Sequence, residues 1–117
     1  MNDNVAIIWD LGGIVVDVNE KLLPFEYYSM NQDWIDFESG KLSVSKFLQK
    51  YPTFISSLDD IFTPNEFVIS LIKTIPSKYQ YYFSNTNPIH FNWLKENYDI
   101  LNTNNRFLSY EIGLRKP

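Results

Sequence analysis

Three residues in separate stretches of the chain could act together on a phosphate group. Asp10 ends an apolar run and precedes Gly12 and Gly13, Ser84 ends an apolar-aromatic run, and Lys116 follows in a third stretch. A carboxylate can act as a nucleophile, a hydroxyl can donate to an anion, and an ammonium group can offset negative charge. Phosphoryl transfer requires these three kinds of group.

Taken singly, each of these residues has a purely structural explanation. Asp10 is a common type of residue at the start of a turn, residues 84–87 suit a polar loop, and Lys116 resembles a solvated surface charge. Their positions change the interpretation, because each lies at or near the end of a predicted strand. Ligands bind at the carboxyl ends of the strands in open parallel sheets, so together the three residues predict an anion site.

Composition limits the class of protein. The 117 residues have room for one domain, and 44% of them are hydrophobic, as in a globular chain. The net charge of −4 and the absence of a basic run argue against a nucleic-acid partner. The lack of cysteine excludes a disulfide scaffold and structural cysteine-ligated zinc. With no signal-peptide pattern and no long apolar stretch, we expect a soluble cytoplasmic protein without a membrane partner.

The alternation of strand and helix patterns predicts the fold class. Residues 5–9 are continuously apolar, as in a strand buried in a parallel sheet, and residues 79–83 and 106–109 are the other predicted strands. Residues 14–16 fit a further short strand or a hairpin arm. The aromatic residues at 81–83 are expected to pack against helices. This order predicts an α/β fold with a Rossmann-like, doubly wound parallel sheet.

Helix signals divide the chain into a core and an insert. Thr63 followed by Pro64 predicts a capped helix that ends before Pro76, and Asn87 predicts the start of another helix over 88–97. The first of these helices has one apolar stripe, formed by Phe67, Val68, Leu71, Ile72 and Ile75. Residues 19–62 predict a small helical insert, with a stop at Gly40 and a cap at Ser43. The core then comprises residues 1–18 and 63–117.

In its motifs the chain resembles the haloacid dehalogenase-like superfamily of hydrolases, specifically its helical-capped, phosphatase-like branch. Asp10 matches the nucleophile of the first motif, Ser84 the hydroxyl of the second, and Lys116 the base of the third. Residues 37–43 resemble the cap segment of that branch, and residues 84–87 resemble its second motif. The resemblance spans nearly the whole chain and implies a partial Rossmann-like core with a helical cap.

The resemblance implies a two-step phosphatase reaction on a small phosphorylated metabolite such as a sugar phosphate. Asp10 would form an aspartyl-phosphate, while Ser84, Asn85 and Lys116 would bind the phosphoryl oxygens. Mg²⁺ would bind Asp10 and the carbonyl of Gly12. The helical insert would close over the site and select the substrate. The alternative is a non-catalytic relative that binds a phosphorylated ligand or a protein, and a dehalogenase is a weaker third choice.

Two departures from the family pattern shape these expectations. Gly12 stands where most phosphatases of the superfamily have a general acid, which favours a leaving group that needs little protonation. The acidic fourth motif that completes the Mg²⁺ site does not follow Lys116, and the acids Asp17, Glu20, Glu38 and Glu111 are out of order for it. We therefore expect a truncated sequence that is inactive alone.

Two further expectations concern the strand at residues 5–9 and the single histidine. The family's strand order would leave residues 5–9 at an exposed sheet edge, available to a second copy or to a C-terminal fragment. His90 is interpreted as a partly exposed helix residue. A supporting role beside the substrate is the alternative.

Overall fold

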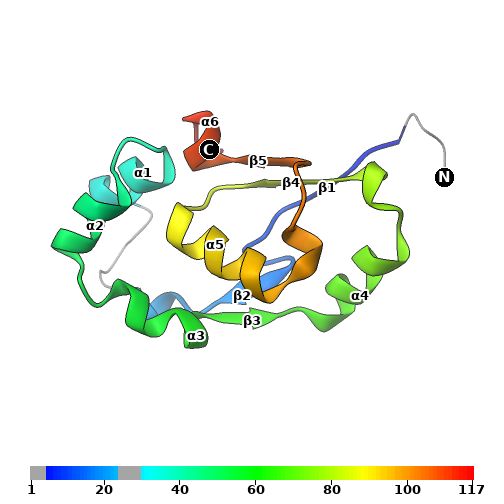
Figure 1. The fold of residues 1–117 in the computed structure, drawn as a ribbon, viewed down its shortest axis with the longest axis horizontal. Helices are drawn as coiled ribbons and strands as arrows, with labels where there is room; N and C mark the ends of the chain where they lie inside the picture. The colour runs from blue at the N-terminus through cyan, green and yellow to red at the C-terminus, as the bar shows by residue number, and fades with distance from the viewer. Residues whose placement is uncertain (1–4, 24–29) are drawn as a thin grey trace.

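A three-stranded parallel sheet forms the centre of the protein. The computed structural model describes residues 5–23 and 30–117. The sheet has the order β1-β4-β5, and both pairings are parallel (Figure 1). Its strands are β1 (Ile7–Trp9), β4 (Gln80–Ser84) and β5 (Arg106–Leu108). A separate antiparallel pair is formed by β2 (Val16–Val18) and β3 (Phe62–Pro64). The predicted α/β class with a parallel sheet is confirmed.

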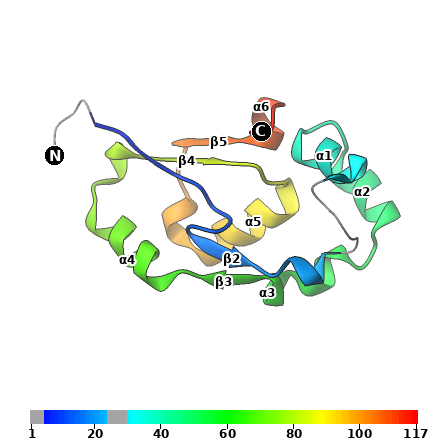
Figure 2. The same ribbon diagram turned by 180° about the vertical axis from the view of Figure 1, so that it is seen from behind.

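Helices gather along one side of the sheet and at one end of the molecule (Figures 1 and 2). The α-helices are α1 (Gln32–Glu38), α2 (Val44–Lys50), α3 (Leu58–Ile61), α4 (Glu66–Thr74), α5 (Pro88–Asn97) and α6 (Ser109–Ile112). Within residues 5–23 and 30–117, the 3₁₀ turns with given bounds are η1 (Glu20–Leu22), η3 (Phe54–Ser57), η4 (Ser77–Tyr79) and η5 (Asp99–Leu101). Within the described ranges, none of these helices is long and apolar enough to cross a membrane.

Two predicted helix starts are confirmed at the level of single hydrogen bonds. Asn87 caps α5 through its side-chain oxygen, which accepts from the backbone N–H of His90, and Pro88 follows at the first helical position. Ser43 caps α2 in the same way through the N–H of Lys46. These caps satisfy donors that the helix itself leaves unpaired. Both signals are local, which explains why the sequence reveals them.

Stacked aromatic rings hold the helices of residues 32–61 together. The rings of Phe37 and Phe47 lie 4.1 Å apart and nearly parallel, and Phe54 meets Phe47 edge-on at 4.9 Å. All three side chains are buried. Edge-on and stacked pairs of this kind stabilise a core beyond the area they bury. Gly40, with a φ of 74°, follows the end of α1, where a helix stop was predicted, and lies against the carbonyl of Tyr110, where a Cβ would clash.

The predicted cap at Thr63 is wrong. Residues Phe62–Pro64 form β3 and pair with β2, so Pro64 ends a strand and the helix α4 starts later. Asn65 is its cap, accepting from the N–H of Val68. The expected apolar stripe is also only partly right, because Phe67 is 79% exposed and Ile69 faces the core with Ile72. The pairing of β3 with β2 buries Phe62 and keeps residues 62–64 extended. This non-local pairing overrides the local cap signal at Thr63.

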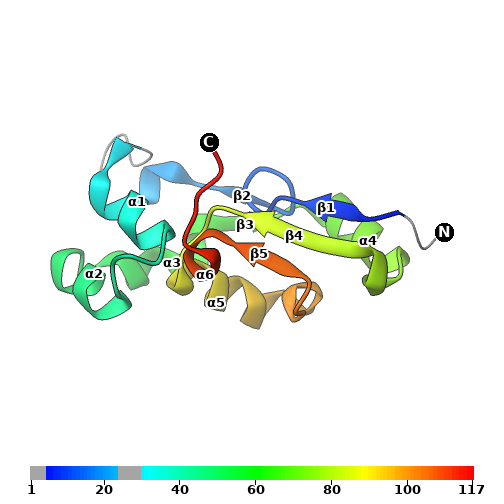
Figure 3. The same ribbon diagram turned by 90° about the horizontal axis from the view of Figure 1, so that it is seen from above.

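One face of the parallel sheet is bare within the described part of the chain (Figure 3). Ile8 and Phe107 are 65% and 50% exposed, and Tyr81 and Phe83 lie between them on the same face. The expectation that the aromatic residues at 81–83 pack against helices therefore holds only for Tyr82, which is buried on the other face. Instead, Tyr81 and Phe83 contact the ring of Phe107.

The revised start of α4 is tested by a pair of substitutions. We expect Asn65→Ala to lower the free energy of unfolding by about 1 kcal/mol, because it removes the capping hydrogen bond. Thr63→Ala, at an exposed strand position, should cost less. Urea denaturation of both variants makes the comparison. A larger loss of stability from Thr63→Ala than from Asn65→Ala would contradict Asn65 as the cap and support Thr63.

The bare face predicts self-association. β1 is an edge strand without a charged residue, and its Ile8 continues an exposed apolar face. We expect the chain to sediment as more than a monomer at low micromolar concentration, and Ile8→Lys to shift it toward the monomer. Phe67→Lys on α4 is the control, since it replaces an even more exposed apolar side chain, 79% against 65% for Ile8, outside the bare face. A monomeric parent chain would contradict the prediction.

Candidate active site

All five residues predicted to form the site line one pocket at the carboxyl ends of β1 and β4. This pocket has a volume of about 330 Å³ and is lined by Asp10, Gly12, Ser84, Asn85, Lys116 and Pro117. We call it the Asp10–Lys116 pocket. Asp10 directly follows β1 and Ser84 ends β4, so the parallel pairing of these strands brings the two residues to one edge.

Lys116 reaches this edge from the C-terminal loop. Gly113, with a φ of 81°, ends α6 in the left-handed conformation and turns the chain back toward the sheet. The ammonium group of Lys116 then lies 3.0 Å from Oδ2 of Asp10 and donates to the carbonyl of Phe83, also at 3.0 Å. The positive charge is therefore fixed beside the carboxylate by two oxygens.

Asn85 holds the backbone of Lys116 in place. Its Oδ1 accepts from the Lys116 N–H at 2.7 Å, and its Nδ2 donates to the Lys116 carbonyl at 3.1 Å. A side-chain amide thus forms both hydrogen bonds of a strand-like pair with one residue of the loop. Asn85 lines the pocket, and its two hydrogen bonds fix the position of the Lys116 backbone.

Asp10 and Ser84 present their oxygens to the same pocket. Oδ1 of Asp10 accepts from the N–H of Leu11 at 2.7 Å, and its side chain is 42% exposed. The hydroxyl of Ser84 is buried and donates to the carbonyl of Asn85 over a long 3.3 Å. A hydrogen bond of that length is weak, so the hydroxyl can be recruited by a better acceptor.

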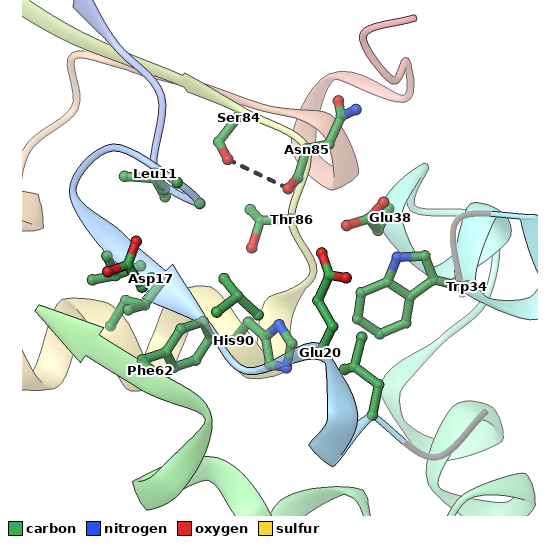
Figure 4. A pocket seen from close by; sticks show the side chains of 16 residues that line it. Leu11, Asp17, Glu20, Trp34, Glu38, Phe62, Ser84, Asn85, Thr86 and His90 are labelled. Carbon is green, nitrogen blue, oxygen red and sulfur yellow. Dashed lines mark hydrogen bonds between the residues drawn. The ribbon is translucent and has the colours of Figure 1, made fainter. Parts of the chain in front are cut away.

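A second, larger cavity opens beside this pocket and shares Gly12, Ser84 and Asn85 with it. Its volume is about 390 Å³. Figure 4 shows that its wall carries the carboxylates of Asp17, Glu20 and Glu38 together with the rings of Trp34, Phe62 and His90. We call it the acidic cavity. The sequence analysis considered these acids only as candidates for the fourth motif and did not predict that they line one cavity.

An ion pair joins helix α1 to the loop that carries Lys116. Arg115 Nε lies 3.0 Å from Oε1 of Glu38, whose side chain is 7% exposed. Burial raises the pKa of Glu38, and the neighbouring Arg115 only partly opposes that rise. Sequence reasoning missed this pair, because the two residues are 77 positions apart. The only hint was that Glu38 lies within residues 37–43 and Arg115 directly precedes Lys116, both of which the sequence analysis had singled out.

The interpretation of His90 as partly exposed is wrong. Its side chain is buried among the rings of Trp34, Phe54 and Phe62, at centroid distances of 5.0 to 5.6 Å. Burial lowers the pKa of His90 to about 3, so the imidazole is neutral at physiological pH. Nε2 has no hydrogen-bond partner among the described residues. Three separate segments supply this aromatic environment, which a helical pattern alone does not indicate.

Within residues 5–23 and 30–117, no group of three or more histidine, cysteine, aspartate or glutamate side chains is arranged to hold a metal ion. Glu111 is paired with Arg106 at 3.0 Å, away from the pocket. The two groups predicted to bind Mg²⁺, the carboxylate of Asp10 and the backbone carbonyl of Gly12, belong to residues that line this pocket. Both are hard ligands of the kind that Mg²⁺ prefers, with water completing its coordination.

The fold is similar to that of a solved HAD family enzyme. No protein-family model matches the sequence, and no curated protein matches it significantly. The HAD family enzyme BT-2542 from Bacteroides thetaiotaomicron, solved as a magnesium complex, superposes with a TM-score of 0.76 at 19% identity, covering 99% of this chain and 73% of that one. An aspartate-to-alanine mutant of that enzyme, in complex with magnesium and inorganic phosphate, also superposes with a TM-score of 0.76. Its identity is 17%, and the alignment covers 97% of this chain and 72% of that one.

The raised pKa of Glu38 predicts a pH effect on stability. The folded state holds this proton more tightly than the unfolded chain, so ionisation of Glu38 opposes folding. The stabilisation that protonated Glu38 gives the folded state is complete below the ordinary pKa of 4.5. It is lost as the pH rises through the raised pKa. We expect Glu38→Gln to remove this decline from the free energy of unfolding, measured by urea denaturation between about pH 4 and pH 7.

Asp33 provides a control of opposite sign. The hydroxyl of Tyr51 donates to its carboxylate, and this bond, with Lys50, holds the pKa of Asp33 below its ordinary value of 3.8. The stabilisation that ionised Asp33 gives the folded state is present above its ordinary pKa and is lost as the pH falls. Asp33→Asn should therefore reduce the loss of stability in acid and leave the decline above pH 4.5 in place. If the free energy of unfolding of Glu38→Gln still declines above pH 4.5, the assignment of that decline to Glu38 is contradicted.

Proposed function

We propose that this chain is a Mg²⁺-dependent HAD-type phosphatase acting on a small phosphorylated metabolite, such as a sugar phosphate. The observation that carries the proposal is the 3.0 Å contact between Lys116 and Asp10 in a pocket that also contains Ser84 and Asn85. A carboxylate nucleophile, a hydroxyl donor and a fixed cation are thereby available to one phosphoryl group. The likeness to an enzyme solved with magnesium and inorganic phosphate supports it.

The proposed reaction has two steps. An oxygen of Asp10 attacks phosphorus while the bond from phosphorus to the ester oxygen breaks, and that oxygen takes a proton from solvent. Water then attacks the aspartyl-phosphate, loses a proton and breaks the bond to Asp10, which returns as a carboxylate. Lys116 offsets the charge of the phosphoryl oxygens, and its move toward them releases Oδ2 of Asp10. Ser84 donates its hydroxyl to the same oxygens.

The residues at the pocket fit a magnesium ion as a partial ligand set. The carboxylate of Asp10 and the carbonyl of Gly12 would hold the ion, with water and a phosphoryl oxygen completing six ligands. Bound there, it would neutralise charge on the phosphoryl group. Two protein ligands make a weak site, so we expect inorganic phosphate to tighten Mg²⁺ binding, and we expect turnover of this chain well below about 1 per second.

We propose that residues 19–62 act as a cap over this site. The 3.0 Å pair of Glu38 with Arg115 holds the end of α1 against the C-terminal loop, and the close approach of Gly40 to Tyr110 holds it against α6. The acidic cavity lies between these helices and the Asp10–Lys116 pocket, where the leaving group of an ester would extend. Such a cover excludes water and selects substrates by the residues it contributes.

A non-catalytic module that binds phosphorylated ligands is the second candidate. It is favoured by one feature of the pocket: both carboxylate oxygens of Asp10 accept hydrogen bonds or ionic contacts from the protein, Oδ1 from Leu11 and Oδ2 from Lys116. A module of this kind would bind phosphate without forming a covalent intermediate. The two candidates therefore differ in the chemistry of Asp10.

Substitution of Asp10 tests the proposal. With Mg²⁺ and an aryl phosphate present in excess, we expect mass spectrometry of the acid-quenched chain to detect a phosphate adduct on the peptide that contains Asp10. Asp10→Asn should abolish the adduct and any Mg²⁺-dependent hydrolysis, because an amide is a poor nucleophile.

Asp60→Asn is the matched control, since it removes an exposed carboxylate on α3 that does not line the Asp10–Lys116 pocket. It should retain the adduct. Binding of inorganic phosphate without any adduct in the parent chain would favour the non-catalytic module. Hydrolysis that persists in Asp10→Asn would remove Asp10 from the mechanism.

A further inference from the structure

A third cavity lies at the amino end of β4, where α4 ends. Figure 1 shows α4 at the end of the molecule opposite α1 and α2. The cavity has a volume of about 280 Å³, and its wall includes Gln80 and Tyr82 of β4. We call it the Tyr82 cavity. Gln80 begins β4 and Ser84 ends it, so about 13 Å of strand separates this cavity from the Asp10–Lys116 pocket.

The hydroxyl of Tyr82 lacks a partner in this cavity. The residue is only 3% exposed, and its hydroxyl has no hydrogen-bond partner among the described residues. Within residues 5–23 and 30–117, the unpartnered side-chain atoms sealed from solvent are Nδ2 of Asn87 and Nε2 of His90, so the Tyr82 hydroxyl keeps accessible surface. Because Tyr82 lines the cavity, a ligand there can reach this hydroxyl. A mostly buried polar group gains free energy when a ligand supplies its partner.

Gln80 occupies acceptors of the wall that would otherwise repel an anion. Its Nε2 donates to the carbonyls of Ile72 and Ile75, both at 3.0 Å, and its Oε1 accepts from the indole N–H of Trp9 at 2.8 Å. These bonds cover carbonyls at the C-terminal end of α4, which is the negative end of the helix. The wall therefore favours a ligand that accepts hydrogen bonds.

The other polar groups of the wall include donors and one positive charge. Burial raises the pKa of Tyr82 to about 12, so its hydroxyl stays protonated at physiological pH and can donate. Thr103 Oγ1 accepts from the N–H of Asn105, which leaves the hydroxyl hydrogen for a ligand. Lys73, exposed in the last turn of α4, is the one charged residue among the described residues of the wall. The apolar residues of the wall are Ile72, Ile75 and Ile100.

We infer that the Tyr82 cavity binds a small aliphatic monocarboxylate. The alkyl chain lies against the three isoleucines, and the carboxylate accepts from the Tyr82 hydroxyl and faces the ammonium group of Lys73. The cavity is slightly smaller than sites for drug-sized ligands, which limits the chain to about six to eight carbons. This site is independent of the proposed function, because it shares no wall residue with the Asp10–Lys116 pocket.

Matched ligands test this inference. Binding of hexanoate, 1-hexanol and hexylamine to the full chain is measured by ligand-observed NMR at low micromolar protein. We expect hexanoate to bind with a Kd of about 1 mM or tighter, about fivefold more tightly than hexanol, and hexylamine to bind most weakly. Lys73→Gln should reduce the preference for hexanoate over hexanol to within about twofold. Tyr82→Phe should weaken hexanoate binding about threefold or more, because it removes only the unpartnered hydroxyl.

The controls are Lys46→Gln, which removes an exposed charge on α2, and Tyr81→Phe, which removes a hydroxyl on the opposite face of β4. Neither residue lines the Tyr82 cavity, so both variants should bind the three ligands as the parent chain does. Inorganic phosphate with Mg²⁺ should not displace hexanoate. Displacement by phosphate would place the carboxylate in the Asp10–Lys116 pocket and overturn the inference. Equal binding of the three ligands, no binding of hexanoate, or unchanged binding in both Lys73→Gln and Tyr82→Phe would also overturn it.

Discussion

The contact between Lys116 and Asp10 is the interaction on which the rest of the site depends. It joins residues 106 positions apart, one directly after the first strand and the other in the C-terminal loop. An ammonium group left unpaired near a sheet edge would be solvated and mobile. Here Asp10, the carbonyl of Phe83 and the two backbone hydrogen bonds from Asn85 fix its position. The charge is therefore held at the pocket before any anion arrives, and the proposed reaction moves the ammonium group from Asp10 to the phosphoryl oxygens.

The same loop links the pocket to the helices beside it. Arg115 precedes Lys116 and pairs with buried Glu38 at the end of α1, while Gly40 lies against the backbone of Tyr110. Burying Glu38 is unfavourable for its ionised form, as its raised pKa indicates. A buried ion pair is weak evidence for stability. Its position between the acidic cavity and the lysine is consistent with a role in holding the two parts of the site in register.

Local signals made much of this architecture predictable. The caps at Asn87 and Ser43 depend on residues within three positions of each helix start, so the sequence was sufficient to predict them. The residues of the Asp10–Lys116 pocket were also predictable, because parallel strands bring their carboxyl ends to one edge. Non-local packing decided the rest. The cap of α4 is Asn65 and not Thr63, because residues 62–64 pair with β2. His90 is buried because rings from distant segments surround it.

The most direct test is a crystal structure of the chain grown with Mg²⁺ and inorganic phosphate. The account predicts phosphate in the Asp10–Lys116 pocket, with its oxygens contacting the hydroxyl of Ser84 and the ammonium group of Lys116. Its phosphorus should face a carboxylate oxygen of Asp10. Phosphate bound elsewhere on the chain, or an ammonium group of Lys116 that stays on Asp10 with the pocket free of phosphate, would contradict it.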